Sequence, residues 1–342
     1  MPRRDAQINP GRSSRYHFES LPADLKRLYV PIRNAVIEGR TEVVLDSSFS
    51  FEDCVKAIES VLMDNPQAFW VRFPATMESR GGASSIRISK TGFHGKREEL
   101  KERLWKAAED IYAKEVEGLK DPYDIEAAVH DVIASKVRYD KSDPATAHSL
   151  IGPLLKKRGV CDGISSSVAF LLNAYGVESS VVTGTKKGNG ESHAWNVVKI
   201  GKEWYHADVT FDMGCSEEGR VSHAFLNMDD RMASRTHGFF PSGRCKATRF
   251  NYYVRRGAYL RSESEAETYL LRRPSKEDVF DFYVEGPADA KKLMAMAASS
   301  RQGTSIRCKH TDGRFVIHVV EGGGINADFG TPQEVRDDVR LP

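Results

Sequence analysis

Apolar residues recur at helical spacing in five stretches of the chain, and each stretch is predicted to be a helix. The five lie within residues 21–39, 50–66, 96–118, 123–140 and 161–175. The second begins with a Ser-x-x-Asp cap at Ser50 and Asp53, and the fifth stops at Gly176, a residue type that suits a helix end. In the fourth, His130 neighbours the apolar stripe, and we expect a satisfied surface or boundary histidine there rather than a ligand.

Shorter runs of alternating or β-branched residues predict strands. These runs are residues 41–46, 67–73, 84–90, 177–184, 192–200 and 203–211. Nearer the C-terminus, a strand pattern, a helix pattern and two more strand patterns follow one another at residues 278–286, 288–299, 305–310 and 314–320. The last two are joined across an Asp-Gly turn, so a small β-α-β-β appendage is predicted between about residues 262 and 323.

Two of these strands predict a histidine and an aspartate side by side. The runs at residues 192–200 and 203–211 flank Gly201-Lys202, a pair suited to a tight hairpin turn. Counting back from this turn places Trp195 opposite Asp208, which leaves His193 and Asp208 as diagonal neighbours on one face. Such neighbours lie roughly 7 to 8 Å apart, near enough for a carboxylate to hold an imidazole.

Cys161 stands at the start of the predicted helix 161–175, where the unpaired N–H groups and the helix dipole favour a thiolate. Gly163, close by, would let a substrate carbonyl approach the backbone. From its position alone the cysteine could be a packing residue or a nucleophile. With His193 as general base and Asp208 as orienting carboxylate, the chain offers the three groups that nucleophilic catalysis requires.

Other polar residues could take these roles. His206 shares the face of Asp208, but we expect it to be a strand histidine at the edge of the core. Asp212 is the alternative to Asp208 if the strand continues that far. His148 could assist the cysteine, although an exposed loop residue is expected.

Three segments resemble the bacterial transglutaminase-like superfamily, a branch of the papain-like cysteine enzymes. They are GVCDGIS, SHAWNVVKIGKEWYHADVTFD and the NYY of residues 251–253. The resemblance implies an α+β fold in which a cysteine-bearing helix packs on an antiparallel sheet, here with a helical N-terminal extension and a small α/β C-terminal appendage. It implies the same catalytic set of Cys161, His193 and Asp208, with no metal and no other cofactor. Trp195, Gly163 and Asp162 adjoin that set and are predicted to contact the substrate.

The predicted function is a cysteine hydrolase, a peptidase or amidase that cleaves peptide or side-chain amide bonds of a protein or peptide through a thioester. A transglutaminase that cross-links or deamidates glutamine is an alternative, because the nucleophile and base are common to both reactions. The sequence contains no calcium loop of the D-x-[DN]-x-[DN]-G type, so it gives no indication of calcium-gated cross-linking. A non-catalytic binding module is a second alternative, favoured by departures from the family pattern at Ile151 and Ile164.

Composition narrows the class of protein. With 29% charged residues, 40% hydrophobic residues and a net charge of +2, the chain is typical of soluble globular proteins, and neither a nucleic acid nor a membrane is an expected partner. The five scattered cysteines, with no C-x-x-C, predict neither a disulfide framework nor a structural zinc site. Without a signal peptide or a long apolar segment, the chain as written is expected in the cytoplasm, or outside the cell if its N-terminus was trimmed.

The length of 342 residues predicts more than one domain. We expect four parts, in chain order. They are a disordered tail at residues 1–20, an N-terminal extension of helices and strands at 21–118, the transglutaminase-like core at 119–260 and a small α+β domain at 261–342.

Overall fold

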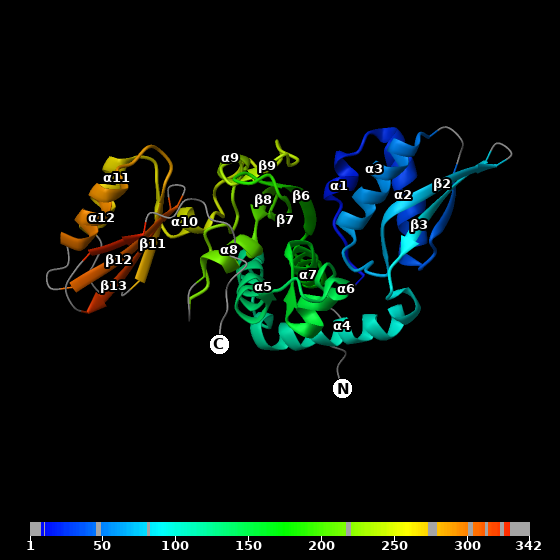
Figure 1. Cartoon of the computed structure of the whole chain (residues 1–342), viewed down its shortest axis with the longest axis horizontal. Helices are drawn as coiled ribbons and strands as arrows, with labels where there is room; N and C mark the ends of the chain where they lie inside the picture. Colours follow the sequence, from blue (N-terminus) through cyan, green and yellow to red (C-terminus); the bar gives the residue numbers. More distant parts are fainter. Residues whose placement is uncertain are drawn as a thin grey trace.

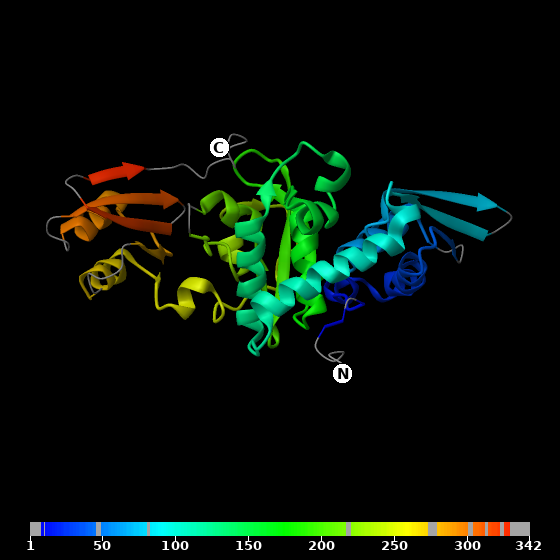
Figure 2. The ribbon, with the colours of Figure 1, turned by 90° about the horizontal axis from the view of Figure 1, so that it is seen from below.

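The structure is a computed structural model of the whole chain. It describes residues 8–9, 11–45, 49–80, 83–216, 220–272, 279–299, 304–311, 314–321 and 325–328. Residues 1–7 of the predicted tail and residues 329–342 of the predicted C-terminal domain lie outside the described parts. Figures 1 and 2 show an elongated molecule in which a central body separates an N-terminal unit from a C-terminal unit.

The described part of the N-terminal unit consists of three helices and a three-stranded antiparallel sheet; the second and third helices contact this sheet, and the first helix packs on the third. The helices are α1 (Tyr16–Ser20), α2 (Ala23–Ile37) and α3 (Phe51–Asp64). The sheet has the order β1-β3-β2 and consists of β1 (Glu42–Leu45), β2 (Val71–Arg80) and β3 (Ala83–Lys90). The predicted cap of α3 is confirmed, because the Ser50 and Asp53 side chains each accept a hydrogen bond from the other residue's backbone N–H. The strand predicted at 67–73 begins instead at Val71.

The central body surrounds a four-stranded antiparallel sheet of order β8-β7-β6-β9. Its strands are β6 (Ser179–Lys186), β7 (Ser192–Ile200), β8 (Glu203–Ala207) and β9 (His237–Gly238). The helices are α4 (Arg97–Ile111), α5 (Pro122–Lys136), α6 (Pro144–Ala147), α7 (Cys161–Ala174), α8 (Val209–Cys215), α9 (Asp230–Ala233) and α10 (Tyr252–Arg255). A short parallel pair joins β4 (Arg138–Tyr139) to β5 (Arg158–Gly159). Single π-helical turns follow α4 (Tyr112–Val116) and precede β5 (Gly152–Lys156).

In the described residues, the C-terminal unit contains a five-stranded sheet and two helices. Its elements are β10 (Tyr259–Leu260), α11 (Glu263–Arg272), β11 (Val279–Val284), α12 (Ala290–Ser299), β12 (Thr304–Thr311), β13 (Arg314–Glu321) and β14 (Ile325–Asp328). The strand order is β10-β11-β13-β12-β14. The predicted β-α-β-β unit is present as β11, α12, β12 and β13. Helix α11, which precedes this β-α-β-β unit, was not predicted from the sequence, because only two of its residues, Ala266 and Leu270, are buried.

The first helix corrects the predicted extent of the disordered tail. α1 begins at Tyr16, inside the range expected to be disordered. The Tyr16 side chain is 1% exposed, and its ring meets the ring of Trp204 edge to face at a centroid distance of 4.8 Å. Burial of this ring helps to dock the segment, because a large aromatic side chain contributes substantial apolar area to the core.

A buried carboxylate joins the N-terminal unit to the central sheet. Asp64, at the end of α3, accepts hydrogen bonds from the backbone N–H groups of His17 and Phe18 and from the Tyr29 hydroxyl, each at 3.0 Å. The hydroxyl of Ser180 on β6 also donates to it at 3.0 Å. Three of these donors belong to the N-terminal unit and Ser180 belongs to the central sheet, so the hydrogen bond from Ser180 links the two units at a carboxylate that would be costly to bury without partners.

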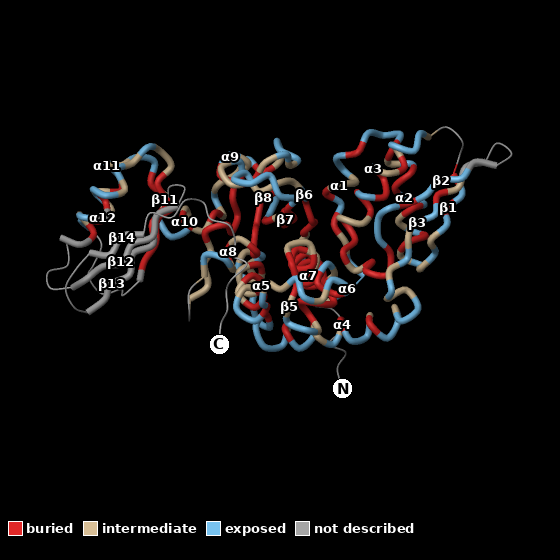
Figure 3. Tube along the Cα trace, in the orientation of Figure 1, coloured by how far each residue is buried: buried red, intermediate tan, exposed pale blue. Residues whose placement is uncertain are grey.

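Helix α7 lies directly against β6 and β7 and is buried along most of its length (Figure 3). Its predicted apolar stripe accounts for this position. Near its N-terminus, Gly163 packs against the backbone of the neighbouring turn so closely that an added Cβ would lie 2.1 Å from the carbonyl oxygen of Ala147. The absence of a side chain at this position therefore lets the first turn of α7 dock where it does.

Replacing Gly163 with alanine should destabilise the protein by about 1–3 kcal/mol, because a backbone carbonyl cannot move aside as a flexible side chain would. The measurement is the free energy of unfolding in urea. Gly188→Ala is the matched control, since nothing lies within 4 Å of a Cβ at that position. Equal stabilities of the two variants would contradict the packing role of Gly163.

Candidate active site

The β7–β8 hairpin brings the predicted histidine and aspartate together. Gly201 has a φ of +64°, as the tight turn requires, and Ile200 pairs with Glu203. Pairing ends at Asn196 and Ala207, so Asp208 follows the last residue of β8. The strand predicted to run to residue 211 is therefore too long. Asp208 instead caps α8 and accepts a hydrogen bond from the backbone N–H of Phe211 at 3.0 Å.

His193 and Asp208 form a buried ion pair. Nε2 of His193 lies 2.7 Å from Oδ2 of Asp208, and neither side chain is more than 1% exposed. Burial alone would lower the pKa of His193 and raise that of Asp208, because both charged forms lose their hydration. Their mutual attraction outweighs burial, so the pKa of His193 rises to about 9 and the pKa of Asp208 falls well below its usual range. At neutral pH the pair is an imidazolium and a carboxylate.

A second histidine shares the same carboxylate oxygen. His237, on β9, places its Nε2 2.9 Å from Oδ2 of Asp208. Burial lowers the pKa of His237, and the charge of His193 adds to this effect, although Asp208 opposes it. Nε2 of His237 donates to Asp208, and its Nδ1 lies 3.0 Å from the Thr236 hydroxyl and 3.2 Å from the carbonyl oxygen of Ala233.

Sequence reasoning missed His237. The residue lies in the irregular stretch after α8, on a strand of two residues that is too short to show any periodicity. Its partner Lys186 is at the far end of β6. Only this tertiary pairing brings His237 to Asp208, so no local pattern could have identified it.

Aromatic rings enclose the group. Phe211 stacks on His193 at 4.6 Å and on His237 at 4.8 Å between ring centroids. The ring of Trp195 lies 4.4 Å from that of His237. Since these rings exclude water, the attraction between Asp208 and its two histidines acts in a low dielectric and is correspondingly strong.

Cys161 is the first residue of α7, as predicted, and is half-buried. Its side chain packs beside Val181 and Ala194 of the sheet and contributes to raising the pKa of His193. Within the described residues, Nδ1 of His193 has no hydrogen-bond partner, whereas Nε2 is occupied by Asp208. Nδ1 is thus the nitrogen left to exchange a proton with the thiol.

The three predicted substrate contacts lie around this group in different environments. Trp195 is 1% exposed and donates its indole N–H to His206 at 3.1 Å. Gly163 is buried beneath the backbone of residue 147. Asp162 is 43% exposed and lies 2.8 Å from Nδ1 of His148, itself 62% exposed as expected for a loop residue. Substrate contact at Trp195, Gly163 and Asp162 stays a prediction.

The remaining polar residues belong elsewhere. His206 is fully buried and pairs with Asp230 at 3.0 Å, which agrees with a structural role. Asp212 is not an alternative to Asp208, because it lies on α8 and its carboxylate contacts His130 at 3.1 Å. The expectation of a surface or boundary position for His130 is wrong, since the residue is 1% exposed. The carboxylate of Asp212, which is distant in sequence, compensates for the burial of His130.

The comparisons with known proteins agree with the resemblance seen in the sequence. Residues 110–209 match the family model described as the transglutaminase-like superfamily. No curated protein matches the chain. In the described residues, no helix is both long and apolar enough to cross a membrane.

Three solved structures align with parts of the chain. One is a TGase, 17% identical over 40% of this chain and 43% of that chain, with a TM-score of 0.27. A candidate cysteine protease from Cytophaga hutchinsonii is 14% identical over 41% of this chain and 62% of that chain, with a TM-score of 0.28. A candidate protease from Parabacteroides distasonis is 9% identical over 72% of this chain and 62% of that chain, with a TM-score of 0.27. This chain thus spans less than two thirds of each.

Removal of the His237 side chain should reduce the reactivity of Cys161, because Asp208 loses one of its hydrogen-bond partners. We expect His237→Ala to lower the alkylation rate of Cys161 by iodoacetamide at pH 6 by roughly 10–100-fold, because a hydrogen bond to a buried charge contributes about 1.5–3 kcal/mol. His237→Gln, which retains an N–H donor, should stay within about threefold of the wild type. The rates are measured for each cysteine by peptide mass spectrometry.

The other thiols serve as internal references in this experiment. Cys54 and Cys245 are buried, which raises the pKa of both, so they should react slowly in every variant. An unchanged Cys161 rate in His237→Ala, or equal losses in the alanine and glutamine variants, would show that the hydrogen bond to Asp208 is not what matters.

Proposed function

We propose, from the premise that residues 110–209 form a transglutaminase-like domain, that the protein is a cysteine-dependent acyl-transfer enzyme that hydrolyses amide bonds in peptides or proteins. The observation that carries the proposal is the 2.7 Å ion pair of His193 and Asp208, which leaves Nδ1 of His193 available beside Cys161. With Cys161 as nucleophile, His193 as base and Asp208 as orienting carboxylate, the chain would have the three groups that covalent catalysis requires.

In the first step the thiolate of Cys161 attacks the carbonyl carbon of an amide. The N–H of a first helical residue has no partner within its helix, so the N-terminus of α7 offers a donor for the developing oxyanion. The imidazolium of His193 then gives its Nδ1 proton to the departing amine. The carbon–nitrogen bond breaks and a thioester to Cys161 remains.

In the second step water hydrolyses the thioester and releases the sulfur of Cys161. Nδ1 of His193, now neutral, takes a proton from a water molecule that attacks the thioester carbonyl. The acid leaves, and the proton stays on His193 opposite the regenerated thiolate. Asp208 holds Nε2 throughout, so the ring presents the same nitrogen to both partners in turn.

The surroundings of Cys161 favour water as the acceptor. Asp162 and His148, beside the N-terminus of α7, are 43% and 62% exposed. Solvent therefore reaches the end of the helix at which the thioester would form. A transferase must exclude water while an amine attacks, and these two exposed polar side chains are a poor barrier.

The test is to incubate a mixed peptide digest and a fluorescent primary amine with the protein in ¹⁸O-labelled water. We expect ¹⁸O in new carboxyl groups, either at cleaved backbone bonds or at former glutamine side chains. Cys161→Ala and His193→Gln should each lower the rate roughly 10³-fold or more, because both groups take part in every step. His148→Gln is the matched control, a histidine near the same helix end, and should stay within about threefold.

Three results would overturn the proposal. Amine incorporation in excess of ¹⁸O incorporation would make the protein a transglutaminase. Turnover that survives in Cys161→Ala would place the chemistry elsewhere. No turnover of any peptide, together with a Cys161 that is alkylated no faster than the exposed thiol of Cys215, would leave a binding module.

A further inference from the structure

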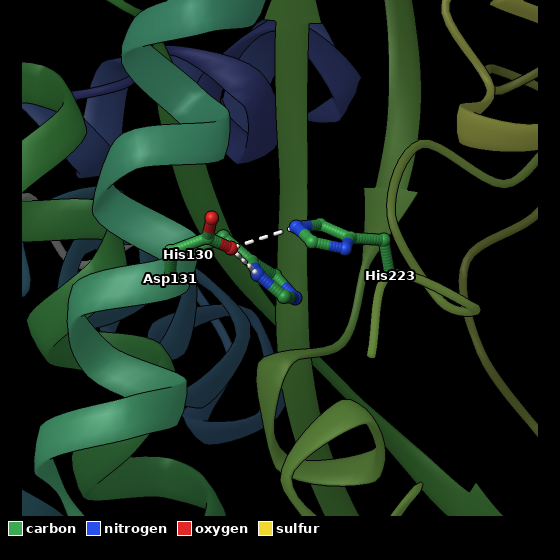
Figure 4. A group of neighbouring side chains, drawn as sticks. All are labelled: His130, Asp131 and His223. Atoms are coloured by element: carbon green, nitrogen blue, oxygen red, sulfur yellow. Dashed lines mark hydrogen bonds and ion pairs between the residues drawn. The ribbon is translucent and has the colours of Figure 1, made fainter. Parts of the chain in front are cut away.

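Outside the active site, two histidines and an aspartate converge at the junction of α5 and the segment after α8. Figure 4 shows His130 and Asp131 on α5 and His223 on the facing segment, with their side chains directed toward one another. One ligand-type atom from each lies within 4.8 Å of the other two. We propose that these three residues bind a divalent transition-metal ion of the Zn²⁺ class, which fastens α5 to the segment that supports Asp208.

The donor set matches that class of ion. Imidazole nitrogen and carboxylate oxygen bind Zn²⁺ at about 2.0–2.2 Å, so neighbouring ligands around a tetrahedral ion lie about 3.4 Å apart. Oδ1 of Asp131 lies 3.0 Å from Nδ1 of His130 and 2.7 Å from Nε2 of His223. Small side-chain movements would therefore open the space for an ion, and three protein ligands leave a fourth position for water.

The cluster has the outer support that metal sites commonly have. Nε2 of His130 lies 3.1 Å from Oδ2 of Asp212, a fully buried carboxylate, which leaves Nδ1 to face the ion. Asp212 is itself held by the Ser222 hydroxyl at 2.6 Å and by the Phe225 N–H at 3.1 Å. A buried carboxylate that orients a ligand histidine raises the basicity of that ligand.

Access and rigidity also fit a binding site. The Asp131 side chain is 47% exposed and that of His223 is 18% exposed, so an ion can enter from solvent. The His223 ring is stacked between His130, at a centroid distance of 4.9 Å, and Tyr252, at 4.8 Å. This stacking holds one ligand in place on the otherwise irregular segment that carries it.

The proposed ion would act on the active site through the backbone. The carbonyl oxygen of Phe225 accepts the N–H of Asp208 at 3.1 Å, and the N–H of Phe225 donates to Asp212. Fixing His223 against α5 therefore fixes a segment that positions the catalytic carboxylate. The ion would have a structural role and take no part in the chemistry at Cys161.

The rival state of the cluster is a proton in place of the ion. Burial lowers the pKa of His130, but Asp131 and Asp212 outweigh it and raise it to about 9. A protonated His130 would bridge the two carboxylates and satisfy the cluster without metal. The experiment must therefore measure binding of the ion itself.

The test uses Co²⁺, whose visible absorption reports its ligands. Titration of the full-length, chelator-treated protein at pH 7.5 should give d–d bands that saturate at one equivalent, without the charge-transfer band of a cobalt–thiolate bond. His223→Ala and Asp131→Asn should each lower the affinity at least tenfold. Zn²⁺ should displace the Co²⁺ and raise the unfolding temperature of the wild type but not of His223→Ala.

Control variants separate this site from two similar groups among the described residues. Those groups are His193, Asp208 and His237, and His206, Asp230 and Cys245. His237→Ala, Cys245→Ala and the exposed His148→Ala should all bind Co²⁺ as the wild type does.

Binding that survives in His223→Ala, a thiolate band, or no d–d absorption at a tenfold excess of Co²⁺ would each overturn the proposal. Circular dichroism of every variant shows whether a loss reflects unfolding instead, and Asp131→Asn, at an exposed position, keeps the test valid if His223→Ala does not fold.

Discussion

The buried carboxylate of Asp208 is the charge on which the candidate active site depends. It accepts hydrogen bonds from His193 on β7, from His237 on β9 and from the backbone of α8. A carboxylate at this depth is tolerable only when such partners surround it. Three segments that are far apart in the chain are therefore held in one arrangement, and His193 is held as an imidazolium beside Cys161.

Buried aspartates that accept hydrogen bonds from separate segments also lie at two other places among the described residues. Asp64 gathers α1, α2 and β6, and Asp212 gathers α5 with residues 222 and 225. Each of the three aspartates is at most 1% exposed. Since an unpaired buried charge costs far more than a lost apolar contact, these carboxylates penalise alternative arrangements of the segments that they join. The N-terminal unit, the central sheet and α5 are connected in this way.

The sequence predicted what depends on local pattern. The helices follow from their apolar stripes, and the register of the β7–β8 hairpin follows from its tight turn, which was enough to pair His193 with Asp208. The end of β8 was misjudged because Asp208 turns away from the strand to cap a helix. His237 and the burial of His130 could not be predicted, because each depends on an aspartate brought to it by tertiary packing.

The most direct test of the account is the ionisation of His193 in the free protein. Selective ¹⁵N labelling of histidine, with the resonances assigned through His193→Gln, allows an NMR titration of its two ring nitrogens. An ion pair with Asp208 predicts that both nitrogens carry protons at pH 7 and that the ring titrates near pH 9, whereas in Asp208→Asn only Cys161 still opposes the effect of burial and the pKa of His193 falls. A wild-type His193 that titrates at or below 6.5, or one that Asp208→Asn leaves unchanged, would contradict it.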